Sequence, residues 1–241
     1  MKKLHRGGNP DGEPLSAGRV EYLEAARQRV RRRRLRRTAI ILAALILVTL
    51  FATGAVGASI ARVKDMVDTV HIALSPAVGW PQQTGLGDLT AVQPMSGSFV
   101  AMDEDACAVY SLGGTRLASI QSGYARPALA AGKTRFVLYN RSGNELRVES
   151  RTQNLYSKTL ENSIYLCAMS DTGTLAVATD SADSTARLTV YTSTMSEQLH
   201  WDMTGAQGTP VRMAFAADSR RLAVAAVTSS AGQLQANLFV L

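Results

Sequence analysis

The sequence predicts an all-β fold: a β-propeller-like domain of WD-repeat-like blades, truncated within its last blade and preceded by one transmembrane α-helix. Three observations predict it: an uncharged apolar run over residues 38–60, a repeat of about 40 residues from residue 89 onward, and short strands within each repeat. The chain then divides into a basic tail (1–37), a membrane span (38–60), a stalk and linker (61–88) and a partial propeller of about four blades (89–241).

The apolar run has the length and composition of a membrane span. It contains 23 residues without a charge, of which eleven are Ile, Leu, Val or Phe. At a rise of about 1.5 Å per residue such a helix is about 35 Å long, which crosses about 30 Å of hydrocarbon. A cleaved signal peptide is the alternative, because Ala55, Gly57 and Ala58 imitate a cleavage site. The long apolar run and the long tail before it argue against cleavage.

The charge of the chain is concentrated before this run. The first 37 residues hold twelve Lys or Arg and four Asp or Glu, whereas the remainder holds fourteen and fifteen. Basic residues next to a span favour the cytoplasmic side, and only Arg62 and Lys64 follow the run. We therefore expect a single-pass protein of the cell membrane with a cytoplasmic N-terminus and an extracytoplasmic propeller. The arginines expected to set this topology and to bind anionic lipid headgroups are Arg31, Arg32, Arg33, Arg34, Arg36 and Arg37.

The nearly neutral charge of residues 38–241 disfavours nucleic acid as a partner of the main domain, since no stripe of Lys and Arg is available to neutralise phosphates. The predicted partners are the membrane and an unknown protein or envelope ligand. Binding of nucleic acid by the arginine tail inside the cell remains an alternative.

Residues 61–88 are predicted to connect the span to the propeller. Val63, Met66, Val67 and Val70 recur at i, i+3, i+4 and i+7, which predicts a short helix over residues 62–70 that extends the anchor as a stalk. Residues 75–88 contain two Pro and three Gly, which predicts irregular structure.

The repeat defines the outer domain. Its apolar strands FVAM, RFVLY, LAVAT and LAVAAV begin 36, 40 and 47 residues apart and each follows a small polar turn. They begin at Phe99, Arg135, Leu175 and Leu222. Second strands follow from Ala106, Glu145, Arg187 and Leu234, and a further strand closes the first three units from Arg116, Asn154 and Gln198.

The fourth unit stops at Leu241 without its outermost strand. Two interpretations are open: a truncated propeller, or one that is closed by a strand from residues 69–74. For a truncated propeller we expect an open last blade that exposes an apolar patch. The residues expected in this patch are Met213, Phe215, Leu222 and Val224.

Two segments resemble the sequences of a known family: GYARPALAAGKTRFVLYNRSGNELRVES at residues 123–150 and TLENSIYLCAMSDTGTLAVATDS at residues 159–181. They resemble domain of unknown function 5711, a family from Gram-positive bacteria. The resemblance covers about residues 31–241 and implies a basic tail, one membrane helix and a WD-repeat-like propeller. The family has no established catalytic residues, so it implies none here.

No catalytic, cofactor-binding or metal-binding residue is predicted. Gly132, Lys133 and Thr134 imitate the end of a phosphate-binding loop, but Pro127 stands where the first Gly is needed and a strand follows instead of a helix. The three histidines, His5, His71 and His200, form no motif.

The acidic groups at residues 103–105 and 180–183 fall in predicted hairpin turns, with a weak calcium site as the alternative. Cys107 and Cys167 lie in apolar strands and are either an extracytoplasmic disulfide or two small buried hydrophobic residues.

These features predict an interaction, scaffold or ligand-sensing module at the cell envelope, not an enzyme. The alternative is a propeller enzyme that acts on a sugar or a quinone-type substrate in the central channel. Such an enzyme needs polar residues that converge from several blades, and no carboxylate or His recurs at one blade position.

Overall fold

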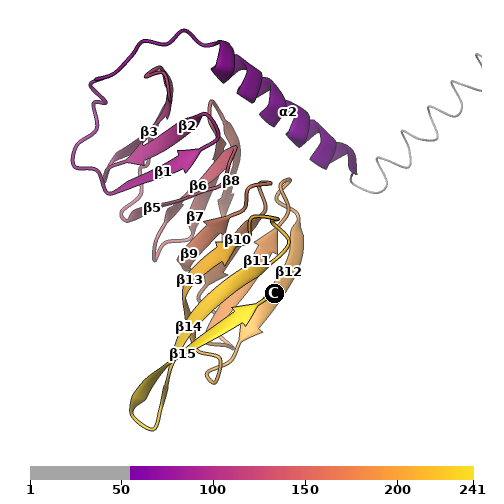
Figure 1. The fold of residues 1–241 in the computed structure, drawn as a ribbon. Helices are drawn as coiled ribbons and strands as arrows, with labels where there is room; N and C mark the ends of the chain where they lie inside the picture. Colours follow the sequence, from indigo (N-terminus) through magenta and orange to yellow (C-terminus); the bar gives the residue numbers. More distant parts are fainter. Residues whose placement is uncertain (1–54) are drawn as a thin grey trace, which may run out of the picture. The chain divides into compact units, whose positions relative to one another are not determined.

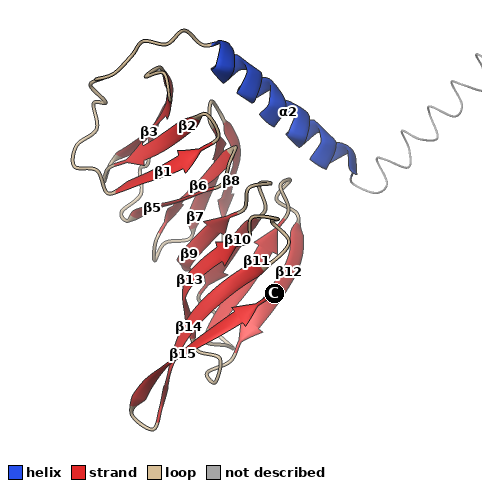
Figure 2. Cartoon of the chain, viewed as in Figure 1, coloured by secondary structure: helices blue, strands red, loops and turns tan. Residues whose placement is uncertain are grey.

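The computed structural model describes residues 55–241, which form the α-helix α2 (Ala55–Leu74) followed by β-strands (Figures 1 and 2). The basic tail, its six arginines and residues 38–54 of the predicted span lie outside the described residues. Residues 55–60, the end of that span, belong to α2. Within residues 55–241, no helix has both the length and the hydropathy needed to cross a membrane.

The strands form four antiparallel sheets, here called blades, in which consecutive strands pair. Blade 1 contains β1 (Ala91–Met95), β2 (Ser98–Met102), β3 (Ala106–Ser111) and β4 (Arg116–Gln121). Blade 2 contains β5 (Pro127–Ala131), β6 (Arg135–Asn140), β7 (Glu145–Ser150) and β8 (Asn154–Thr159). Blade 3 contains β9 (Ile164–Met169), β10 (Leu175–Thr179), β11 (Ala186–Tyr191) and β12 (Glu197–Met203). Blade 4 contains β13 (Thr209–Phe215), β14 (Leu222–Ser230) and β15 (Gln233–Val240). The fourth sheet has three strands, as the repeat predicts.

The first strands of blades 1, 2 and 4 were not predicted as strands from the sequence, whereas β9 of blade 3 contains Cys167, which was placed in an apolar strand. β1, β5 and β13 contain Pro94, Pro127 and Pro210, and proline lowers the expectation of a strand because it donates no hydrogen bond to the ladder. The structure brings these first strands together, since β1 contacts β5, β5 contacts β9 and β9 contacts β13. Sheets that meet along their first strands have the radial arrangement of a propeller.

Three hydrophobic clusters lie between consecutive blades. Side chains of one strand alternate between the two faces of its sheet, so each blade contributes to the clusters on both of its sides. In β10, Leu175 and Val177 face blade 2, whereas Ala176 and Ala178 face blade 4. Each inner blade therefore buries both faces only because it has two neighbours.

The free face of blade 1 is covered by the linker that precedes it. The Trp80 ring lies with its centroid 5.7 Å from that of Phe99 and 5.8 Å from that of Tyr110. Its Nε1–H donates to the carbonyl of Leu112 at 3.0 Å, and the Tyr110 hydroxyl donates to the carbonyl of Thr84 at 3.2 Å. The irregular segment 76–88 thus caps the first blade in place of a neighbouring blade.

Two expectations about the ends of the repeat array are wrong. Residues 69–74 do not form a closing strand but the last turns of α2, which contains the helix predicted over residues 62–70. Their helical period places Thr69 and Ile72 on one side of the helix, which a strand cannot do. In blade 4, Met213, Leu222 and Val224 are buried and Phe215 is partly buried, because these side chains face blade 3.

The structure decides between the two interpretations of the cysteines, a disulfide or two buried hydrophobic residues. Cys107 lies in β3 and Cys167 in β9, and both are buried free thiols. Burial raises the pKa of the Cys107 thiol to about 12 and also raises that of Cys167. The disulfide interpretation is therefore wrong, and both residues act as small hydrophobic side chains.

Candidate interaction site on helix α2

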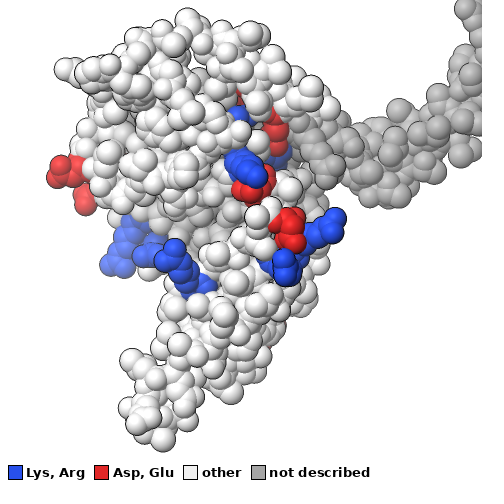
Figure 3. Space-filling model, in the orientation of Figure 1, with Lys and Arg blue, Asp and Glu red and all other residues white. Residues whose placement is uncertain are grey.

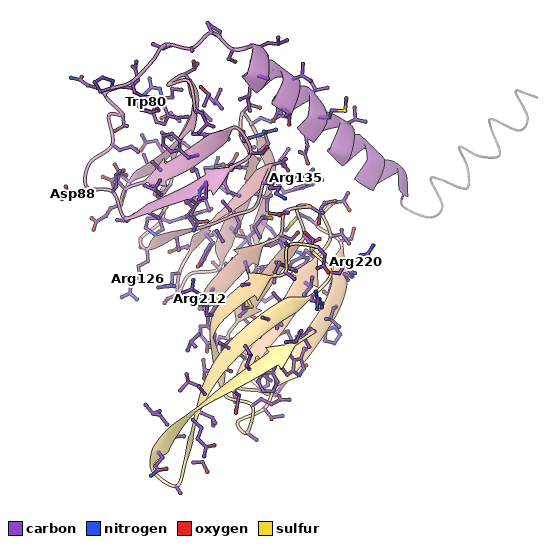
Figure 4. The ribbon with its side chains drawn as sticks, in the orientation of Figure 1. Trp80, Asp88, Arg126, Arg135, Arg212 and Arg220 are labelled. Carbon is purple, nitrogen blue, oxygen red and sulfur yellow. The ribbon has the colours of Figure 1, made fainter. Side chains whose placement is uncertain are left out.

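Helix α2 is attached to the blades by an ion pair that the sequence did not predict. Arg135, at the start of β6, is almost fully buried, and its Nε and Nη2 lie 3.2 Å from the Asp65 carboxylate (Figure 4). The Thr134 hydroxyl donates to the same carboxylate at 3.2 Å, and Arg135 Nη1 donates to the carbonyl of Ser193 at 2.6 Å. This single arginine therefore joins α2 to blades 2 and 3.

A second arginine joins α2 to blade 1. Arg151 is 0% exposed, and its Nη1 donates to the carbonyl of Ser96 at 2.9 Å. Its Nη2 donates to the carbonyl of Asp65 at 3.1 Å and to the Thr69 hydroxyl at 2.7 Å. Burial lowers the pKa of Arg151, while the nearby Asp68 and Asp65 oppose that shift. Arginine still keeps its charge, so the site needs these acceptors.

The docking side chains share one face of α2. Asp65, Asp68, Thr69 and Ile72 follow the spacing i, i+3, i+4 and i+7, and the Thr152 hydroxyl completes the contact by donating to Asp68 at 2.9 Å. A helix that turns its polar face toward a β domain is unusual, because helices generally bury the apolar side. The buried arginines explain it, since they supply the matching charge.

The opposite side of α2 carries an exposed apolar stripe. Val63, Met66, Val67 and Val70, the residues that predict this helix, are 60%, 69%, 62% and 49% exposed, and Leu74 continues the stripe. The sequence thus predicted the helix from the side that does not contact the blades. Contiguous exposed apolar side chains mark surfaces that bind a partner.

Small pockets flank the blades. One of about 310 Å³ lies between the last turn of α2 and blade 1, and Ile72, Leu112 and Arg151 are among its lining residues. The other, of about 330 Å³, lies between blades 2 and 3, where the Lys158 ammonium is 4.2 Å from the centroid of the Tyr191 ring. Both volumes lie at the lower end of the range of about 300 to 1,000 Å³ that is usual for ligand sites.

Lys133 and His200 are both exposed and each lies next to a carboxylate. Lys133 forms an exposed ion pair of 2.9 Å with Asp171, in the turn before β6. His200 is exposed on β12, with Nδ1 3.0 Å from Glu197.

The acidic groups serve turn geometry, as predicted. Asp103 accepts hydrogen bonds from the backbone amides of Gly87, Asp105 and Ala106, and the bond from Gly87 is the largest cause of its lowered pKa. Asp180 accepts from the Tyr165 hydroxyl and from its neighbouring amide. Within residues 55–241, no group of three or more His, Cys, Asp or Glu side chains is placed to hold a metal ion.

Comparison with known proteins identifies the family. Residues 78–240 match the model described as Family of unknown function (DUF5711). The chain belongs to this family. A comparison with curated proteins finds no match. The family match covers the four blades and most of the capping segment, but not α2.

Several solved structures are similar to this DUF5711 chain. KlAtg21, in complex with the coiled coil of AgAtg16, is 14% identical with a TM-score of 0.50, over 67% of this chain and 54% of that one. Hsv2 of Kluyveromyces marxianus is 14% identical with a TM-score of 0.47, over 57% and 44%. The Pan2 WD40 domain of Neurospora crassa is 10% identical with a TM-score of 0.43, over 64% and 48%.

The chain spans about half the length of these structures. At such low identity the likeness shows the fold alone: an all-β, propeller-like arrangement of four-stranded antiparallel sheets.

Proposed function

We propose that this chain is a single-pass membrane protein whose propeller-like domain lies outside the cell and acts as an interaction module at the envelope. The observation that carries the proposal is the two-sided character of α2. Its polar face is attached to three blades through Arg135 and Arg151, and its apolar stripe is free. A helix of this kind connects the domain to an anchor on one side and offers a binding surface on the other.

The anchor is supported by the continuity of the sequence. The uncharged run at residues 38–60 leads directly into α2, whose described residues begin at Ala55. A flexible linker would leave the domain free to tumble, whereas a docked helix restricts its orientation. The buried arginines hold the blades in one orientation relative to α2.

The partner that fits the stripe is a protein with an apolar helix or groove. Val63, Met66, Val67 and Val70 present branched or flexible apolar side chains along one helix face, and helix-in-groove recognition uses anchors at this spacing. KlAtg21 is seen in complex with a coiled coil, which shows that a protein of similar fold binds a helical partner. Here the proposed contact is made by α2, outside the blades.

Labelling of introduced cysteines tests the anchor and its orientation. Ser230→Cys lies at the exposed tip of the β14–β15 hairpin, and Ser16→Cys lies in the basic tail; both native cysteines are buried. A membrane-impermeant maleimide is added to intact cells in which the outer face of the cell membrane is accessible. It should label Ser230→Cys without permeabilisation. Ser16→Cys should react only after permeabilisation.

The arginines serve as the control for this orientation. Replacing Arg31, Arg32, Arg33, Arg34, Arg36 and Arg37 by Gln should give mixed labelling, because Arg62 and Lys64 then become the dominant basic flank. If intact cells label Ser16→Cys but not Ser230→Cys, the orientation of the chain is the opposite of the one proposed. Recovery of the whole chain in the soluble fraction would contradict the anchor itself.

A further inference from the structure

Blades 1 and 2 are joined by an arginine that spans the space between their outer strands. Arg147 of β7 faces blade 1 and forms an ion pair of 3.0 Å with the buried Glu149. Its Nη1 donates to the carbonyl of Gln121 at 3.4 Å. Gln121 is the last residue of β4, the outer strand of blade 1. The guanidinium therefore fills the groove between the two blades.

Blade 3 carries a short side chain at the position of this arginine. Arg147 pairs with Leu138 of β6, which faces blade 1. Thr189 pairs with Val177 of β10, which faces blade 2. Both residues thus lie on the face of their blade that meets the preceding blade, at the same register. Thr189 is the equivalent of Arg147.

The pocket between blades 2 and 3 occupies the space that Arg147 spans in the preceding interface. Thr159 is the last residue of β8, as Gln121 is of β4. Both Thr159 and Thr189 line the pocket. Because the side chain of threonine is much shorter than that of arginine, it does not bridge the two blades, and a pocket of about 330 Å³ remains.

The lining of this pocket offers polar groups that other protein groups do not use. Within residues 55–241, the side chains of Lys158, Asn162 and Thr189 form no hydrogen bond or ion pair. The Lys158 ammonium instead lies 4.2 Å from the centroid of the Tyr191 ring. Thr189 and Tyr191 are both buried and form the floor. Buried polar groups generally have partners, so this floor is suited to a polar molecule.

The charges of the lining cancel, which favours a neutral ligand. The lining contains the cations Lys158 and Arg187 and the carboxylates Glu161 and Glu197, and Arg187 also forms an ion pair of 2.6 Å with Asp202. An ion in the pocket would meet charges of both signs. A neutral molecule with several hydroxyl groups fits better, because each hydroxyl can donate to a carboxylate and accept from an ammonium or an amide.

An anion has a more suitable surface elsewhere on the domain. Figure 3 shows basic side chains grouped together without an acidic one among them, on the face where Figure 4 labels Arg126 and Arg212. Both arginines are exposed, and neither lines the pocket. Clustered charge of one sign attracts ions of the other, so this surface and not the pocket suits phosphate or carboxylate.

We propose that the pocket between blades 2 and 3 is a binding site for a neutral saccharide, which binds Thr189 and Asn162 at the floor and the carboxylates at the rim. Its volume of about 330 Å³ suits one or two sugar rings. None of its described lining residues belongs to α2. The site is therefore independent of the anchor and of the apolar stripe, and its test can fail without affecting either.

Saturation-transfer NMR tests the proposal on the full chain in a detergent without a sugar headgroup. The probes are maltose, cellobiose and the disaccharide of N-acetylglucosamine, each at about 10 mM, which detects a Kd in the millimolar range. We expect at least one disaccharide to bind, with a Kd that an excess of inorganic phosphate does not change. Failure of all three to bind would overturn the proposal. Displacement of the sugar by phosphate would overturn it as well, because the site would then select an anion.

A matched pair of substitutions tests the hydroxyl in the floor. Thr189→Val keeps the shape of the side chain and removes the hydroxyl, so the Kd of the bound disaccharide should rise about tenfold while Tm does not fall. Thr189→Ser keeps the hydroxyl and should bind the same disaccharide within about threefold of the natural chain. Equal Kd values for Thr189→Val and Thr189→Ser would place the sugar elsewhere and overturn the proposal.

Thr189→Arg tests the pocket by copying the preceding interface. The new guanidinium should reach the carbonyl of Thr159, fill the pocket and abolish sugar binding, with Tm lowered by no more than about 3 °C. If this variant is unstable, Thr189→Arg combined with Tyr191→Glu reproduces the ion pair of Arg147 with Glu149. Sugar binding that persists in either folded variant would overturn the assignment to this pocket.

Discussion

At the scale of single residues, the strongest constraint is the charge that the blades bury. Arg135 and Arg151 lie beneath α2 with almost no exposure, and Asp65 contacts both, through its carboxylate and its carbonyl respectively. Removing one partner of a buried ion pair leaves a charge without compensation, whereas an exposed pair contributes little.

This contrast predicts the effect of neutralising Asp65. Asp65→Asn should reduce the free energy of unfolding by about 3 kcal/mol, because Arg135 stays buried without its counterion. Asp171→Asn removes the exposed pair with Lys133 and should cost at most about 1 kcal/mol. Urea denaturation of the two variants checks this. Equal costs would show that the α2 contact is not part of the folded core.

Asp103 is the residue whose ionisation links the capping segment to blade 1. The largest cause of its lowered pKa is the hydrogen bond from the Gly87 amide. The ionised carboxylate therefore stabilises the fold at a pH above the ordinary pKa of Asp, and this stabilisation is lost as the pH falls through the lowered pKa. In a Trp201→Phe background, Trp80 is the only tryptophan of the sequence. We expect its emission to shift to the red as pH falls below about 4, when segment 76–88 detaches.

The control for this acid effect is Asp103→Asn. The amide keeps one acceptor and carries no charge, so Trp80 emission should vary little with pH over the same range and the segment should be less stable at pH 7. An acid transition of the same midpoint and amplitude in Asp103→Asn would assign the effect to another group.

At the scale of elements, α2 has two different faces: one binds the buried arginines of the blades, and the other carries the exposed apolar stripe. Thr69 accepts a hydrogen bond from buried Arg151, whereas Val67 lies on the exposed stripe. Thr69→Val should lower the free energy of unfolding by about 1 to 3 kcal/mol, because Arg151 loses an acceptor in a buried site. Val67→Glu should change stability by no more than about 0.5 kcal/mol.

The same pair of variants distinguishes binding from folding. If the stripe binds a helical partner, Val67→Glu should remove the product that a lysine-reactive cross-linker forms in native membranes, while the protein level stays normal. A cross-linking pattern unchanged by Val67→Glu would contradict the assignment of the partner site to α2.

At the scale of the whole molecule, the described blades differ in how many neighbours they have. Blade 1 is covered by segment 76–88 on one face and by blade 2 on the other, and blades 2 and 3 each lie between two blades. Within residues 55–241, the hydrophobic cluster that blade 4 joins is the one it shares with blade 3. In an array of repeats, stability depends on the interfaces that each repeat makes with its neighbours.

Native-state hydrogen exchange should follow this order. Amides of β14 should exchange at least about tenfold faster than those of the equivalent β10, even though both are central strands with the same Leu-Ala-Val-Ala sequence. Trimming the chain at residue 203 should shift fast exchange to β10, which loses its cover. Equal protection of β10 and β14 in the intact chain would show that the open face does not lower the stability of blade 4.

The sequence by itself determined the repeat, the strands that form the middle of each blade, the incomplete fourth blade and the helical stalk, because these depend on local alternation and on a period of about 40 residues. It did not reveal the first strands of blades 1, 2 and 4, where Pro94, Pro127 and Pro210 weaken the local signal and contacts between blades decide the conformation.

Only the tertiary structure decided how the ends of the array are covered. Asp65 is 70 residues from Arg135 in the chain and 86 from Arg151, so no local pattern relates them. The same holds for Trp80, which reaches Phe99 and Tyr110 by folding back across blade 1. Alternation predicts two faces for every strand, but which face meets a neighbour depends on the position of the next blade in space. For that reason the apolar set expected to be exposed in blade 4 proved to be buried, and its opposite face is the open one.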